Sequence, residues 1–187
     1  MSGIVVIGAS AGGLHALEAI LDPLPADYSK PILVVQHRSD DGSALLSGLL
    51  ARHTRLVVSE ADDKSALRPG CVLVAPAGYH ALVEDGHVSL STDGEVRFSR
   101  PSIDVSFETA AEAYGERAVG VVLTGANDDG SRGLAAIRRA GGTAIVQEPA
   151  SAEHTAMPAA AVAAADPQWV LPLEAIAERL VALEVLR

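Results

Sequence analysis

The chain of 187 residues has a net charge of −10, and 49% of its residues are apolar whereas 3% are aromatic. This length fits a single domain over residues 1–187 with a sizeable core, and the apolar content excludes a disordered chain. The negative charge argues against nucleic acid as a partner, and no apolar run approaches the ~20 residues needed to cross a bilayer.

The remaining composition points to a cytoplasmic protein with no direct insertion into a membrane. The single cysteine cannot form an internal disulfide, and no basic segment followed by a short apolar stretch indicates a secretory signal. No cluster of residues has the spacing of metal ligands, so neither a metal nor another cofactor is expected.

The first half of the chain alternates between strands and helices. Residues 4–7 are apolar on both faces, as in a buried parallel strand, and residues 14–24 carry apolar side chains at helical spacing. A second strand over 32–37, a helix over about 42–53 and a short strand over 56–58 follow. Between residues 71 and 98, short strands with turns at 85–86 and 93–94 predict a β-hairpin insertion.

The second half continues the alternation. Ser102 is expected to cap a helix with apolar side chains at positions 107, 110, 111 and 114. Strands over 119–123 and 143–147 enclose a helix over 134–139, and the last segment is helical with an apolar stripe from 173 to 183. We therefore predict an α/β fold, a doubly wound and mainly parallel sheet with a β-hairpin insertion.

The loop over residues 8–13 places Ser10 on a tight turn between the first strand and the first helix. Glycines at 8, 12 and 13 allow this turn, and the start of a helix offers backbone N–H groups. This arrangement suits a nucleophile with an oxyanion hole. A dinucleotide site is excluded, because a serine replaces the middle glycine of the fingerprint and no acid ends the second strand. A phosphate-binding P-loop is excluded because the loop has no lysine.

Polar residues follow several of the predicted strands. The second strand ends in Gln36, His37 and Arg38, and the strand over 119–123 leads to Asp128 and Asp129. Each of them alone fits a cap or a solvated loop. Because carboxyl ends of parallel strands share one edge of a sheet, Ser10, His37 and an aspartate could meet there as nucleophile, general base and orienting acid.

Six blocks of this chain, in order, resemble the catalytic domain of CheB-type protein-glutamate methylesterases, which demethylate bacterial chemoreceptors. The blocks cover residues 7–13, 35–37, 75–80, 100–105, 123–130 and 147–158. The resemblance implies a Ser-His-Asp triad of Ser10, His37 and Asp129. Asp129 is preferred to Asp128 because the acid of the family directly precedes a glycine.

Two departures from the family pattern accompany the resemblance. Where the family has a Met-Gly pair, this chain has Ala126 and Asn127, which can alter the turn near the nucleophile. Family members typically also carry an N-terminal phospho-receiver domain, whereas this sequence begins at the catalytic domain. Phosphorylation within the same chain is therefore not expected to regulate the protein, and a separate regulatory protein is a candidate partner.

The expected activity is hydrolysis of glutamate methyl esters on a helix of a methylated chemoreceptor, with deamidation of glutamine as a side activity. Backbone N–H groups at Ala11, Gly12 and Ala126 are the candidates for the oxyanion hole, and Arg38 and Arg132 for docking an acidic receptor helix. Two alternatives stay open: an esterase or amidase for another protein or small substrate, and a non-catalytic binding module of the same fold.

Overall fold

A parallel sheet forms the centre of the molecule. The computed structural model describes residues 3–37 and 43–185. In this part of the chain the sheet has seven strands in the order β10-β9-β8-β1-β2-β5-β3, and every neighbouring pair is parallel. The strands are β1 (Ile4–Ala9), β2 (Ile32–Gln36), β3 (Val57–Glu60), β5 (Cys71–Val74), β8 (Ala118–Val122), β9 (Thr143–Gln147) and β10 (Trp169–Leu171).

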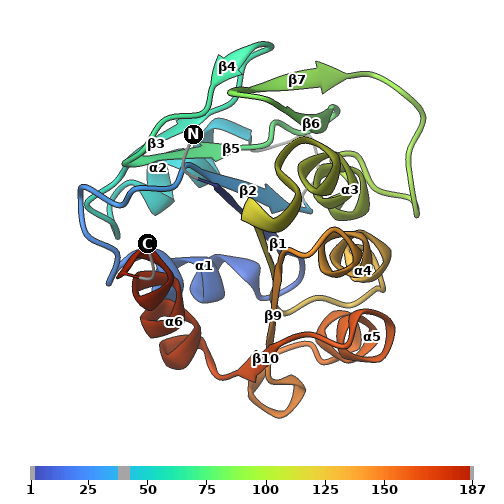
Figure 1. Cartoon of the computed structure of the whole chain (residues 1–187). Coiled ribbons are helices and arrows are strands. Elements are labelled where there is room, and N and C mark those ends of the chain that lie inside the picture. Colours follow the sequence, from blue (N-terminus) through green and yellow to red (C-terminus); the bar gives the residue numbers. More distant parts are fainter. Residues whose placement is uncertain (1–2, 38–42, 186–187) are drawn as a thin grey trace.

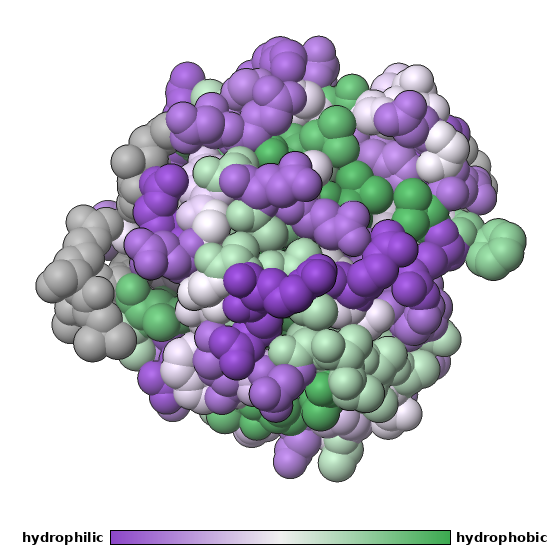
Figure 2. Space-filling model, turned by 45° about the vertical axis from the view of Figure 1, so that its right-hand side comes forward, coloured by the Kyte–Doolittle hydropathy of each residue, from purple (hydrophilic) through white to green (hydrophobic). Residues whose placement is uncertain are grey.

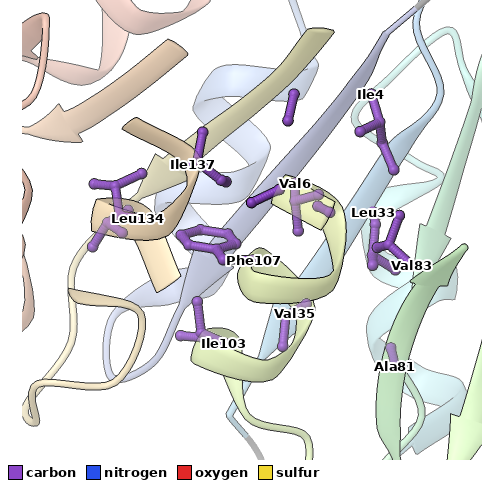
Figure 3. Close-up of a cluster of buried hydrophobic side chains, with 14 of the residues drawn as sticks. Ile4, Val6, Leu33, Val35, Ala81, Val83, Ile103, Phe107, Leu134 and Ile137 are labelled. Atoms are coloured by element: carbon purple, nitrogen blue, oxygen red, sulfur yellow. The ribbon is translucent and has the colours of Figure 1, made fainter. Parts of the chain in front are cut away.

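Helices cover both faces of this sheet (Figure 1). One face carries α1 (Gly13–Leu21), α2 (Ser43–Leu50) and α6 (Leu173–Val185), and the other carries α3 (Ile103–Tyr114), α4 (Ser131–Arg139) and α5 (Ala156–Ala165). Alternate side chains of β1 enter the two cores: Val5 packs with the α1 side, and Val6 with the α3 side. Figure 3 shows Val6 and Phe107 in the second of these cores. The predicted α/β fold is confirmed.

A small antiparallel sheet packs beside α3. It has the order β4-β7-β6 and contains β4 (Ser65–Ala66), β6 (His80–Glu84) and β7 (His87–Ser91). β6 and β7 form the predicted hairpin, with the turn at Asp85 and Gly86. The prediction was wrong for residues 71–74: β5 belongs to the main sheet and pairs in parallel with β2 and β3. Val72 and Val74 are fully buried there, which a solvated hairpin would not provide.

Three elements, α5, β4 and β10, were not predicted from the sequence. α5 was not predicted, because its alanine-rich sequence has no polar face and therefore no helical period. The strands β4 and β10, of two and three residues, are too short to give an alternating pattern. Two 3-10 helices, η2 (Gly115–Arg117) and η3 (Pro149–Ser151), complete the described elements.

The connectivity places the end of β1 at the switch point of the sheet. β1 lies between β2 and β8, and α1 and α3 lie on opposite faces (Figure 1). Loops that follow β1, β2 and β8 therefore meet at one edge, where parallel sheets bind ligands. No helix in the described part of the chain is long and apolar enough to cross a membrane. Figure 2 shows hydrophilic side chains spread over one face of the molecule, separating small hydrophobic areas.

Candidate active site

Ser10 follows the last residue of β1 and precedes α1. Its backbone N–H donates to Thr124 O of the neighbouring β8 loop (3.0 Å), and its carbonyl accepts from Gly13 N–H (2.9 Å). Gly12 closes the turn with φ +76°, a left-handed conformation that disfavours side chains. A Cβ at Gly12 would also lie 2.7 Å from a carboxylate oxygen of Glu153. The turn thus fixes the Ser10 side chain at the carboxyl edge of the sheet, as predicted.

His37 lies beside Ser10 because β1 and β2 are neighbours in register. Ala9 is paired with Gln36, and His37 N–H donates to Ala9 O at 3.0 Å. The His37 Nδ1 atom is 3.2 Å from Ser10 Oγ, and its Nε2 is 2.7 Å from Asp129 Oδ2. An ionised carboxylate can only accept, so Nε2 carries a proton, and in the neutral imidazole the lone pair of Nδ1 faces the Ser10 hydroxyl.

Asp129 is fully buried and accepts five hydrogen bonds. In addition to His37 Nε2, the donors are Ser102 Oγ and Asp104 N–H to Oδ1 (3.0 and 2.9 Å), Ile103 N–H to Oδ2 (2.7 Å), and Gly130 N–H to Oδ1 (3.0 Å). Three of these donors stand at the start of α3, where the helix dipole favours a negative charge. Asp129 is therefore the acceptor that caps α3.

The balance of these contacts sets the protonation of Asp129. Burial alone would raise its pKa, but the hydrogen bonds from His37 and from the backbone of Asp104 and Ile103 more than offset burial, so its pKa is lowered. The carboxylate stays ionised beside the imidazole. The expected cap by Ser102 was wrong in its mechanism: Ser102 occupies the N-cap position but makes no side-chain cap bond, and its hydroxyl donates to Asp129 instead.

Asp128 and Asp129 have distinct surroundings. The side chain of Asp128 is 56% exposed and forms an ion pair with Arg97, whereas that of Asp129 is fully buried at His37. The structure therefore brings together the three residues predicted for the triad, Ser10, His37 and Asp129, and leaves Asp128 on the outside.

The candidate oxyanion donors lie around Ser10. Among the described residues, the N–H groups of Ala11, Gly12 and Ala126 have no hydrogen-bond acceptor. Ala11 and Gly12 follow the nucleophile directly, and Ala126 belongs to the β8 loop whose Thr124 is bonded to Ser10. A role of these groups in an oxyanion hole stays a prediction.

Of the two predicted arginines, the structure describes Arg132, whose ion pairs are with Glu108 and Asp104. Arg38 lies outside the described residues. Arg132 on α4 is half-exposed; its Nε lies 3.1 Å from Glu108 Oε1 and 3.9 Å from Asp104 Oδ2. Its nearest carboxylates are those of α3, and the expected contact with a receptor stays a prediction.

Asp104, which the sequence analysis did not single out, contacts the surroundings of Ser10, His37 and Asp129. Asp104 is fully buried and accepts Gly133 N–H at 2.7 Å and Arg97 Nε at 3.0 Å. Burial and the nearby charge of Asp129 raise its pKa, against the opposing effects of Gly133 N–H and of Arg97. The only signal in the sequence was its place in the block 100–105, since an acid in the first turn of a helix has an ordinary explanation.

Two amide side chains complete the site. Gln36 Nε2 donates to the carbonyl oxygens of Ser10 (2.7 Å) and His37 (2.9 Å), and so joins the two loops. Asn127 Nδ2 lies 3.4 Å from His37 Nδ1, and Asn127 Oδ1 accepts Asp129 N–H at 3.1 Å. The departure from the family pattern at position 127 therefore places an amide beside the imidazole nitrogen that faces Ser10.

A cleft of about 510 Å³ opens beside Ser10. Its walls include Gln36 and Glu153 and an apolar side formed by Leu14 of α1 with Leu45 and Leu49 of α2. Within the described residues, no three His, Cys, Asp or Glu side chains are grouped to hold a metal ion. The cleft thus offers an apolar wall next to the Ser10 hydroxyl.

The model of the family described as CheB methylesterase matches residues 5–180. The chain belongs to this family. A putative protein-glutamate methylesterase/protein-glutamine glutaminase of Leptospira interrogans is 44% identical over 181 residues, which are 96% of this chain and 94% of the relative. CheB relatives are also found in longer proteins: the match to a protein-glutamate methylesterase/protein-glutamine glutaminase of Anaeromyxobacter dehalogenans is 44% identical and covers 95% of this chain but 52% of that protein.

A solved CheB structure has the same fold. The crystal structure of the Thermotoga maritima CheB methylesterase catalytic domain matches with a TM-score of 0.93 and 34% identity, over 98% of this chain and 100% of that one. The family predicted from the sequence blocks is thus confirmed.

Proposed function

We propose that this protein hydrolyses γ-methyl esters of glutamate side chains on a helix of a chemoreceptor-like protein, with Ser10 as the nucleophile. The observation that carries the proposal is the chain of contacts from Ser10 Oγ to His37 Nδ1 (3.2 Å) and from His37 Nε2 to Asp129 Oδ2 (2.7 Å). Membership of the CheB methylesterase family and the names of the relatives support this substrate class. The cytoplasmic location stays a prediction of the sequence.

In the first half of the reaction the ester carbon is attacked by Ser10 Oγ. His37 Nδ1 takes the hydroxyl proton, and the ionised Asp129 stabilises the imidazolium through Nε2–H. The tetrahedral oxyanion accepts hydrogen bonds from Ala11 or Gly12 N–H and from Ala126 N–H; each such donor contributes about 10²–10³ to a rate. The imidazolium then protonates the methoxy oxygen, methanol leaves, and a glutamyl-serine ester remains.

The second half restores the enzyme. His37 removes a proton from a water molecule that attacks the glutamyl-serine carbonyl, and the Ser10 oxygen leaves with the proton from the imidazolium. The products are a glutamate carboxylate and free Ser10. The same steps with a glutamine side chain release ammonia in place of methanol, which accounts for the proposed deamidation.

Release of methanol from a methylated chemoreceptor tests the proposal. We expect the wild type to release it and Ser10→Ala to lose at least ~10⁴ of the rate, because the nucleophile is removed. Ser59→Ala is the matched control, since Ser59 is an exposed serine on the edge strand β3. Equal rates for Ser10→Ala and Ser59→Ala would contradict a nucleophilic role for Ser10.

Two further measurements separate the alternatives. A panel of small esters and amides, assayed beside the receptor, identifies an enzyme that prefers another substrate. Stoichiometric labelling of Ser10 by a serine-directed covalent inhibitor distinguishes an enzyme from a non-catalytic binding module, which would leave Ser10 unlabelled.

A further inference from the structure

A tight turn at residues 96–99 stands beside the candidate active site. Val96 and Ser99 form a two-residue hairpin bridge with N–O distances of 3.2 and 3.0 Å. Its central residues are Arg97 and Phe98, with φ of +52° and +60°. Such turns usually contain Asn and Gly, because a bulky side chain is strained in this left-handed conformation. The chain therefore keeps two bulky residues where smaller ones would fold more easily.

Arg97 fastens this turn to the residues around Asp129. Its Nε donates to Asp104 Oδ2 at 3.0 Å, and its Nη1 donates to Asp128 Oδ2. Asp128 directly precedes Asp129, and Asp104 N–H is one of the donors to Asp129. The carboxylates also raise the pKa of Arg97, so it keeps its charge. The turn is therefore held at the border of the site.

Phe98 projects from this fastened turn into solvent. It is 98% exposed, more than any other large hydrophobic residue described. Backbone strain that surrounding contacts maintain is typical of functional sites, and a rigidly presented aromatic side chain is typical of a binding anchor. Phe98 does not line the cleft beside Ser10, so only a substrate that extends beyond this cleft would contact it.

We propose that Phe98 is the docking residue for the protein substrate and packs against an apolar side chain of the helix that carries the glutamyl ester. This inference rests on the proposed function, since it names how that substrate is held. Arg97 acts as a positioning residue, because its carboxylate contacts fix the turn. The substrate helix accordingly has an apolar residue near its methylated glutamate.

Phe98→Asn tests the docking role, because asparagine tolerates positive φ and removes the aromatic ring. We expect KM for a methylated receptor to rise about tenfold or more, as for loss of a binding hot spot, with kcat little changed. Hydrolysis of p-nitrophenyl acetate stays within about twofold of wild type. The melting temperature is expected to be unchanged or higher, since strain is relieved. Phe98→Trp should restore the KM, and Val57→Thr, at an exposed position on β3, should have no effect.

The outcomes separate the two proposals. If the wild type releases methanol and Phe98→Asn has an unchanged KM, or loses small-ester and receptor activity equally, the docking role is wrong and the proposed function stands. If the wild type cleaves the small ester but releases no methanol from the receptor, the proposed function is wrong and the docking role with it. Binding of the methylated receptor to Ser10→Ala, with and without Phe98→Asn, gives a second measure that needs no turnover: equal dissociation constants would overturn the proposal.

Discussion

Replacing Asp129 by asparagine should reverse the proton on His37. Oδ1 of Asp129 accepts three of its five bonds, so the amide oxygen is expected at that position and the NH₂ group at the position of Oδ2. The NH₂ group then donates to His37 Nε2, which must accept. The imidazole proton moves to Nδ1, 3.2 Å from Ser10 Oγ, where a lone pair is needed. The variant has a base that cannot take the serine proton.

The structure gives two magnitudes for this variant. A wrong tautomer in a Ser-His-Asp triad lowers kcat by about 10⁴, which corresponds to about 5 kcal/mol of lost transition-state stabilisation. Ile103 N–H also loses its acceptor, since the NH₂ group cannot accept. An unsatisfied buried N–H costs about 1–3 kcal/mol, so the melting temperature should fall by about 2–12 °C for a chain of this length.

Hydrolysis of the methylated receptor and of a small ester, with thermal melts followed by circular dichroism, measures both effects. Asp128→Asn is the control, because that exposed neighbouring carboxylate has no contact with His37; on the small ester it should stay within about tenfold of wild type. The reasoning would be refuted if Asp129→Asn hydrolysed the small ester within tenfold of the wild-type rate, or if Asp128→Asn lost as much activity as Asp129→Asn.

The same variant has a distinct dependence of stability on pH. The pKa of Asp129 is lowered below the ordinary value of 3.8, so its ionised form stabilises the fold above that value. This contribution is lost as pH falls from 3.8 through the lower pKa of the folded state. The free energy of unfolding can be measured by denaturant titration between pH 5 and pH 2, in steps of ~1 pH unit. As pH falls, it should decrease less for Asp129→Asn than for wild type. Parallel curves would contradict the charge assigned to Asp129.

Two further substitutions test the packing and the polar contacts of the site. Gly125→Ala should lower kcat for a small ester by about tenfold or more, because the added Cβ would lie 2.9 Å from Ser10 Cβ and displace the nucleophile. Gly48→Ala is the control, since no atom lies within 4 Å of a Cβ at that position. Equal effects of the two substitutions on kcat would be inconsistent with this packing. Asn127→Gly should raise kcat/KM by up to about fivefold, because the side-chain amide 3.4 Å from His37 Nδ1 no longer competes with the serine hydroxyl for that nitrogen. It should also lower the melting temperature by about 2–4 °C, because the hydrogen bond from Asp129 N–H to Asn127 Oδ1 is lost. A fall in small-ester kcat/KM for this variant would show that the amide assists the base.

Some features could not be predicted because their causes are not local. β5 was assigned to the hairpin insertion because a short apolar run has the same pattern in either sheet. Only its pairing with β2 and β3 shows that it belongs to the main sheet. α5 was not predicted because its alanine-rich sequence is apolar on every face of the helix and so has no helical period. The cap of α3 was assigned to Ser102, the residue next to it in sequence, whereas the acceptor comes from Asp129, more than twenty residues further along the chain.

The sequence alone determined the general alternation of strands and helices, the glycine turn at Ser10 and the polar residues after β1, β2 and β8, since apolar periodicity and turn residues act over a few neighbouring positions. The tertiary structure decided which of two adjacent aspartates is buried at His37, which imidazole nitrogen faces Ser10, and that Arg97 joins Asp104 to Asp128. These outcomes depend on how the β8 loop, the start of α3 and the turn at 96–99 come together. Contacts between segments far apart in the chain have no period or spacing in the sequence from which they can be read.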